Sequence, residues 1–284
     1  MAVNNSITQT QTKSTGANIA TFLTRDAVQT QINNVVGGQN GQRFISAVVS
    51  AVNNNPGLQK CTNQSIFSAA LLGEALKLSP SPQLGHYYMV PFNVKGEDVA
   101  QFQLGYKGYI QLALRSGQYR KLNVLAIKEG ELVRFDPLNE EITVNLIQDE
   151  EIREETPTMG YYAMFEYTNG FRKAIYWSKP RMERHALKYS QGYRAKKGYT
   201  FWEKDFDSMA YKTMLRQLIS KWGIMSIEMV TAMDSDMAVI NEDGSKNYVD
   251  NPETPDNPVV IDGTVVDEQT TDPKQETIED LGDF

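Results

Sequence analysis

Positive and aromatic side chains stand next to each other along much of this chain, and this pairing suits one kind of chemistry. The neighbouring pairs are Tyr106–Lys107, Tyr119–Arg120, Phe171–Arg172, Lys188–Tyr189 and Tyr193–Arg194. Cations neutralise phosphates whatever the base sequence, and aromatic rings stack on exposed bases. The pattern therefore predicts binding to single-stranded nucleic acid. A plainer alternative stays open, in which the rings belong to the core and the charges to a solvated surface.

The stretch 104–117, LGYKGYIQLALRSG, concentrates this pattern. Set on a helix, its residues recur on two sides, with Tyr106, Ile110 and Ala113 on one and Lys107, Gln111 and Arg115 on the other. The spacing predicts a helix with an apolar stripe and a basic stripe. Gly105 and Gly108 fall in its first turn, where the missing side chains would let another backbone approach closely, and a phosphate chain could lie there.

The charge of the chain is divided between two parts. The net charge is −7, yet residues 234–284 hold two Lys and no Arg against 15 Asp and Glu. Residues 1–233 hold 26 basic and 20 acidic residues, a net of +6, and 13 of the basic residues lie between 172 and 221. Such an asymmetry is typical of a nucleic-acid-binding body with an acidic appendage.

Composition and periodicity predict three regions. Residues 1–40 have few large apolar groups apart from Ile19, Phe22 and Leu23, so we expect a disordered, flexible N-terminal arm with at most one short helix. Residues 41–233 should form a folded, nucleic-acid-binding core. Residues 234–284 are expected to be a disordered acidic tail, whose final segment KQETIEDLGDF is a possible partner-binding peptide.

The core is predicted to be α+β. Runs of period two at 86–92 and 98–104 predict a hairpin, and Asn169-Gly170 predicts another. Further strands are expected at 119–127, 131–137 and 141–147. Helical spacing predicts helices from 41, after 62, over 178–190 and, as one long C-terminal helix, over about 202–233. The fold class is therefore a twisted, mostly antiparallel hairpin sheet packed against helices.

The same residues offer little support for an enzyme. There is no GxxxxGK[ST] motif for ATP, and His86 and His185 stand alone, as structural histidines often do. Cys61 is the only cysteine, which excludes an internal disulfide and a multi-cysteine zinc site. Asp205 and Asp207 could hold Mg²⁺, but acidic residues at a helix start more often complement its dipole. No signal-like or membrane-length apolar run occurs, so a cytoplasmic protein without a membrane contact is expected.

Four segments, in this order, resemble the RecT family of phage single-strand annealing recombinases. They are KLSPSPQLGHYYMVPF (77–92), LGYKGYIQLALRSGQY (104–119), YWSKPRMERHALKYS (176–190) and FWEKDFDSMAYKTMLRQLISKW (201–222). The resemblance implies that residues 41–233 are a DNA-binding, annealing and oligomerisation core, which anneals strands without ATP and assembles into a homo-oligomeric ring or helical filament on single-stranded DNA. A location in the bacterial host's cytoplasm is implied as well. It also implies a partner exonuclease, and the acidic tail is a candidate contact for that nuclease or for a host single-strand-binding protein.

Residues and resemblance together predict a basic groove that holds one strand by its backbone. The predicted contacts are Tyr106, Lys107, Arg115, Arg120, Lys188, Arg194, Lys196, Lys197, Lys212, Arg216 and Lys221. Lys107, Lys212 and Arg216 are favoured, because they lie both in the RecT-like segments and on basic helical stripes. Alanine at Lys212 and Arg216 is expected to flatten the salt dependence of binding, whereas deleting 234–284 is expected to leave annealing intact. The alternatives are a passive single-strand binder and a metal-dependent nuclease.

Overall fold

A computed structural model describes residues 15–37, 40–94, 96–198 and 200–248. The helices are α1 (Thr15–Leu23), α2 (Asp26–Val36), α3 (Gly41–Asn53), the 3₁₀ turn η1 (Leu58–Lys60), α4 (Asn63–Ala75), α5 (Tyr106–Arg115), α6 (Glu150–Glu155), α7 (Lys179–Tyr189), α8 (Gln191–Arg194), α9 (Phe201–Lys204), α10 (Phe206–Trp222) and α11 (Ile227–Ser235). The strands are β1 (Tyr87–Val94), β2 (Glu97–Leu104), β3 (Tyr119–Lys128), β4 (Leu132–Asp136), β5 (Glu141–Val144), β6 (Thr158–Tyr167), β7 (Arg172–Ser178), β8 (Ala238–Ile240) and β9 (Lys246–Tyr248). The predicted α+β class is confirmed.

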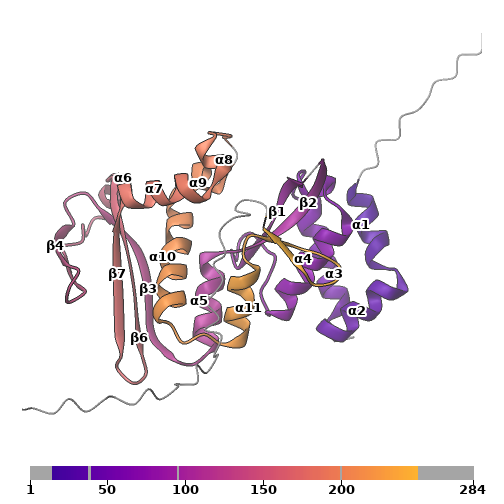
Figure 1. Cartoon of the computed structure of the whole chain (residues 1–284), viewed down its shortest axis with the longest axis horizontal. Coiled ribbons are helices and arrows are strands. Elements are labelled where there is room, and N and C mark those ends of the chain that lie inside the picture. The colour runs from indigo at the N-terminus through magenta and orange to yellow at the C-terminus, as the bar shows by residue number, and fades with distance from the viewer. Residues whose placement is uncertain (1–14, 38–39, 95, 199, 249–284) are drawn as a thin grey trace, which may run out of the picture. The chain divides into compact units, whose positions relative to one another are not determined.

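The strands form three antiparallel sheets in the described residues rather than one. Their orders are β1-β2-β8-β9, β3-β6-β7 and β4-β5. Both predicted hairpins occur, since β1 pairs with β2 and β6 pairs with β7 across the Asn169-Gly170 turn. Figure 1 shows α10 along one face of β3-β6-β7 and the β4-β5 hairpin on the other.

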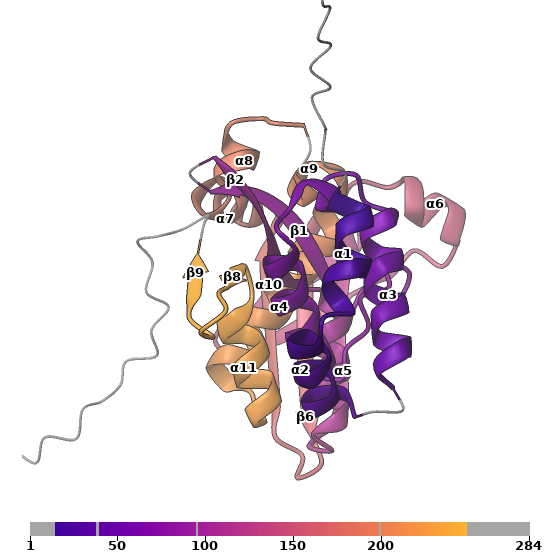
Figure 2. The same ribbon diagram turned by 90° about the vertical axis from the view of Figure 1, so that its right-hand side faces the viewer.

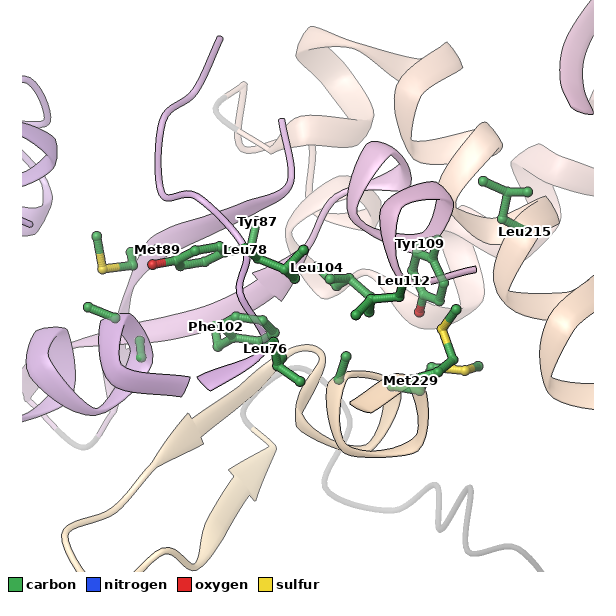
Figure 3. Close-up of a cluster of buried hydrophobic side chains, with 14 of the residues drawn as sticks. Leu76, Leu78, Tyr87, Met89, Phe102, Leu104, Tyr109, Leu112, Leu215 and Met229 are labelled. Carbon is green, nitrogen blue, oxygen red and sulfur yellow. The ribbon is translucent and has the colours of Figure 1, made fainter. Parts of the chain in front are cut away.

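One buried cluster joins the first sheet to the helices. Side chains labelled in Figure 3 come from the end of α4, from β1 and β2, and from α5, α10 and α11. Tyr87 stacks on Phe102 across the hairpin, with ring centroids 5.1 Å apart. Tyr109 of α5 is fully buried, so the hairpin and the helix that follows it share a core.

The folded part of the chain extends beyond the predicted core at both ends. Two helices lie within residues 15–36, and Ile19, Leu23 and Ile32 are fully buried against α3 and α4. These few apolar residues fall on one side of each helix, which is enough to dock them despite a polar composition. Residues 1–14 lie outside the described part of the chain.

At the other end, the fold continues past residue 234. The strands β8 and β9 extend the first sheet, and Phe102 of β2 pairs with Ala238. Figure 2 shows both strands beside α11. The remainder of the predicted acidic tail, 249–284, lies outside the described residues.

The predicted long C-terminal helix is divided into α9, α10 and α11. Asp205 leaves helical geometry and caps α10, accepting a hydrogen bond from the Ser208 amide at 3.0 Å. Gly223 is extended and ends α10. The next turn is held by two tyrosines of the second sheet, because the Tyr119 hydroxyl donates to the Ile224 carbonyl and the Tyr167 hydroxyl to that of Trp222.

Candidate nucleic-acid interface

The helix α5 presents its basic stripe to solvent, as predicted. Lys107, Gln111 and Arg115 are exposed, whereas the buried side consists of Gly108, Tyr109, Leu112 and Ala113. The Arg115 guanidinium donates to the Leu76 carbonyl at 2.7 Å, so it also satisfies the last turn of α4. A planar guanidinium has five donors, which leaves Arg115 able to contact an anion as well.

Gly105 and Gly108 admit another stretch of backbone, as predicted, but that stretch is not a phosphate chain. A Cβ on Gly105 would stand 2.1 Å from the Gly85 carbonyl oxygen, and one on Gly108 the same distance from that of His86. The Gly105 amide donates to the His86 carbonyl at 2.9 Å. The close approach at this turn is therefore made by the protein's own backbone and leaves no room there for a phosphate chain.

That backbone places His86 beside the basic stripe. Its Nδ1 accepts a hydrogen bond from the Ser79 amide at 3.3 Å. Burial lowers the pKa of His86, and the positive charges of Arg115 and Lys107 lower it further. Arg115 also lines a hollow of about 360 Å³ together with Lys77, Leu76, Ser226 and Glu228. The basic stripe of α5 thus gives its surroundings a positive potential, which disfavours protonation of His86.

A second group of exposed cations lies on α7, α8 and the loop that follows: Lys188, Arg194, Lys196 and Lys197. Two aromatic residues connect this group to α5. Tyr88 of β1 and Phe201 of α9 face each other at 5.5 Å between ring centroids. The Tyr88 hydroxyl and the Lys107 stem both lie within 3.4 Å of the position that a Gly85 Cβ would occupy. We call these four cations, with Lys107 and Arg115, the basic surface.

Lys212 does not belong to that surface. Its residue is only 6% exposed, and its Nζ donates to Asp236 Oδ1 at 2.8 Å. Arg216 Nη1 donates to Oδ2 of the same carboxylate at 3.1 Å. The prediction of an accessible phosphate contact is therefore corrected for Lys212, because a buried carboxylate already holds its charge. Arg216 is partly buried in the same cluster, its side chain 28% exposed.

Asp236 was missed because it lies in the segment predicted to be disordered. Its side chain is fully buried and also accepts from the Leu104 amide at 2.9 Å and the Tyr109 hydroxyl at 3.4 Å. Desolvation lowers the pKa of Lys212, although Asp236 opposes that shift. A Lys and an Arg one turn apart, next to Met214, Leu215 and Leu218 on the same helix, were the available signal for such a buried counter-ion.

The three remaining predicted contacts lie elsewhere. Tyr106 packs edge-on against Tyr211 at 5.6 Å and is half-buried. Arg120 at the start of β3 and Lys221 at the end of α10 are both exposed. Because α10 has 17 residues, that end is about 25 Å from α9, at 1.5 Å per residue. The structure therefore separates Arg120 and Lys221 from the cations near α9, whereas Arg115 lies closer to them, since it lines a hollow with Ser226 and Glu228 beyond the end of α10.

The acidic pair considered for Mg²⁺ serves the protein's own structure. Asp205 caps α10, and Asp207 accepts from the Tyr161 hydroxyl at 2.6 Å. Within the described ranges, no three His, Cys, Asp or Glu side chains are grouped so that they could hold a metal ion. Nor is any helix of those ranges long and apolar enough to cross a membrane.

Comparisons with known proteins agree with this geometry at the C-terminal end of the core. A model of the RecT family matches residues 42–252, which includes β8 and β9. The chain is 40% identical over 247 residues to the uncharacterized protein YqaK of Bacillus subtilis (strain 168), covering 87% of this chain and 80% of that protein. It is 30% identical over 200 residues to Protein RecT of Escherichia coli (strain K12), covering 69% and 71%.

Proposed function

Because the chain belongs to the RecT family, which supports a role in recombination by single-strand annealing, we propose that it binds single-stranded DNA along the basic surface and pairs it with a complementary strand. The family match over 42–252 carries this proposal. The exposure of the six cations, with the Tyr88–Phe201 ring pair between their two groups, supports the placement of the strand.

The proposed mechanism divides affinity from specificity. Lys107, Arg115 and the cations of α7 and α8 contact phosphates and release counterions, a contribution that does not depend on base sequence. The bases stay accessible, so a second strand tests them by Watson–Crick pairing. No ATP is consumed, since pairing itself supplies the free energy. Several copies side by side would extend the surface along one strand, and the exonuclease and host single-strand-binding protein remain proposed partners.

Phe201 and Tyr88 are the proposed stacking residues. Phe201 is 37% exposed and Tyr88 is half-buried, so one ring face of the pair is offered beside Lys107. Stacking on a base contributes about 1–3 kcal/mol and tolerates any sequence. It would fix the position of the strand where the two groups of cations meet.

The test is a mixing assay with labelled complementary oligonucleotides, without ATP, on wild type and on Lys107→Ala/Lys197→Ala. Duplex gain supports annealing. Protection of the strands without duplex gain would make the protein a passive binder, and shortened products would indicate a nuclease. Six phosphate contacts give a salt slope of about −4 for single strands, and losing two should reduce its magnitude by about 1.4.

The matched control is Arg43→Ala/Lys60→Ala, which removes two exposed cations on α3 and η1. This control should keep both the slope and the duplex yield. An equal effect of the two double variants would show that net charge alone, rather than the basic surface, sets the affinity.

A further inference from the structure

Two exposed surfaces of the described chain differ in the sign of their charge, but both carry large apolar side chains. The first, which we call the turn surface, follows α10. Trp222, Ile224, Met225 and Ile227 are 50%, 46%, 38% and 85% exposed there. The turn is rigid, since Tyr119 and Tyr167 hydroxyls bond its backbone. The exposed cations Arg120, Lys121 and Lys221 flank it, outnumbering the two carboxylates there, the exposed Glu228 and the partly buried Glu166, which Arg120 and Lys121 contact at 3.1 and 3.3 Å.

The second, which we call the α6 surface, is acidic. Asp149, Glu150, Glu151, Glu154 and Glu155 are all exposed, and between them Ile152 is 57% exposed. Met159, at the start of β6, adds a side chain that is 47% exposed. Large apolar side chains exposed to solvent, as Ile152 and Met159 are, are typical of a docking site when they lie together.

The α6 surface is also held in place. Arg153 turns inward, where its Nε donates to the buried Glu131 carboxylate at 2.6 Å and its Nη2 to the Ala126 carbonyl at 2.8 Å. Glu131 in turn accepts from the Lys128 amide at 2.7 Å. Burial raises the pKa of Glu131, but Arg153 and two backbone amides outweigh it and keep the carboxylate ionised. The only Arg of α6 is thus used internally, which leaves its outer side acidic.

The two surfaces lie at opposite ends of β3. The turn surface is bonded to Tyr119 at the start of that strand, and α6 is bonded through Arg153 to the Ala126 carbonyl near its end. Seven residues at about 3.3 Å each separate them by about 23 Å, and Figure 1 shows α6 at the upper end of the strands and the α10–α11 turn at the lower end. They therefore cannot meet within one molecule.

We propose that the α6 surface of one copy docks on the turn surface of the next copy. Opposite charges and apolar side chains on both sides make the second copy the fitting partner. Because the two surfaces differ, the contact is heterologous and repeats from copy to copy, giving a ring or a helical filament. It also gives Arg120 and Lys221 a role outside the basic surface. The inference deepens the proposed function, because it names the surfaces that align copies along a strand.

The experiment uses two full-length variants, Ile152→Lys on the α6 surface and Ile227→Glu on the turn surface. Each should block assembly alone, because each introduces a charge of the same sign as its partner surface. Mixed one to one, they should form a complex of two copies and stop, since one intact surface of each kind remains. Sedimentation velocity, with and without an oligonucleotide, measures the sizes. Val35→Lys and Val35→Glu are matched controls on α2, where the side chain is 44% exposed, and should assemble like wild type.

The results separate this inference from the proposed function. Assembly by either variant alone, or a mixture that remains monomeric, would overturn the α6–turn contact while annealing could still stand. Failure of wild type to anneal, with heterodimers formed in the mixture, would overturn the function and keep the contact. Glu151→Lys/Glu154→Lys and Lys221→Glu repeat the design through charge alone and guard against a folding defect in the first pair.

Discussion

Removing the charge of Asp236 should destabilise the fold more than any surface substitution. Its carboxylate accepts from Lys212 at 2.8 Å, Arg216 at 3.1 Å and the Leu104 amide at 2.9 Å. Asp236→Asn keeps the shape of the side chain but leaves Lys212 without its counter-ion in the core. Breaking a buried pair in this way costs about 3–5 kcal/mol. We expect about 3 kcal/mol, because the part-exposed Arg216 regains water.

The pKa of Lys212 determines how the stability lost in Asp236→Asn should depend on pH. The pKa of Lys212 in the folded state lies below its usual value, through burial. Between the folded and unfolded values the unfolded chain binds more protons, so stability rises with pH across that window. Without Asp236 the folded pKa falls further and the window extends downward. Asp236→Asn should therefore regain part of its lost stability between pH 7 and pH 9, more than wild type gains.

Urea unfolding at both pH values measures these free energies. Lys212→Met should cost less, about 1–3 kcal/mol, because three donors remain on Asp236. The double variant should cost clearly less than the two single losses together. The reasoning is refuted if Asp236→Asn unfolds at the wild-type midpoint. It is equally refuted if Lys212→Met leaves stability unchanged and lowers the salt slope of DNA binding, as the sequence-based hypothesis expected.

Three further predictions concern the ends of the chain, His86 and the α5 turn. Deleting 249–284 should leave the unfolding midpoint unchanged, whereas deleting 234–284 also removes Asp236, β8 and β9 and should lower the midpoint. Thermal melts of the two truncations measure this, and equal midpoints would contradict the buried role of Asp236. A bound phosphate should raise the pKa of His86, so strand affinity should increase as pH falls from 7 to 5, by at most about tenfold per pH unit for one proton. Anisotropy titrations should find this increase lost in His86→Gln, and a wild-type affinity that does not change with pH would show that His86 is not part of the site. Gly108→Ala should destabilise the fold, because its Cβ would stand 2.1 Å from the His86 carbonyl oxygen, whereas Gly130→Ala, in a turn with no atom within 4 Å of the added Cβ, should cost only the strain of its positive φ, about 1 kcal/mol.

Local patterns predicted most elements but not their partners. Period-two runs and the Asn169-Gly170 turn located the hairpins, since hairpin geometry is set by neighbours in sequence. The grouping into three sheets depends on contacts such as Phe102 with Ala238, 136 residues apart, and no local signal carries that information. The helix α6 was missed for a related reason, because its anchor is the Arg153–Glu131 pair rather than an apolar stripe.

The candidate site shows the same division. Lys107 and Arg115 were predicted as exposed from the spacing of one helix, and that spacing holds whatever packs on the other side. Lys212 and Arg216 obey the same spacing, yet Asp236 draws them into the core. Helical periodicity says that residues share a side of a helix and cannot say whether that side faces water. Composition is misleading here as well, because an acidic segment is expected to be solvated, whereas the Asp236 carboxylate is buried.

The position of Asp236 late in the chain has a consequence for synthesis. Leu104, Tyr109, Lys212 and Arg216 all leave the ribosome before the carboxylate that binds them. Since domains fold as units once their residues are available, we expect α10 to stay loosely packed on a nascent chain that ends before residue 236. Limited proteolysis of stalled chains, ending just before and well after that residue, would detect the difference. The last tenth of the described polypeptide thus supplies the carboxylate that completes the buried polar cluster, whose other members all come from the preceding two hundred residues.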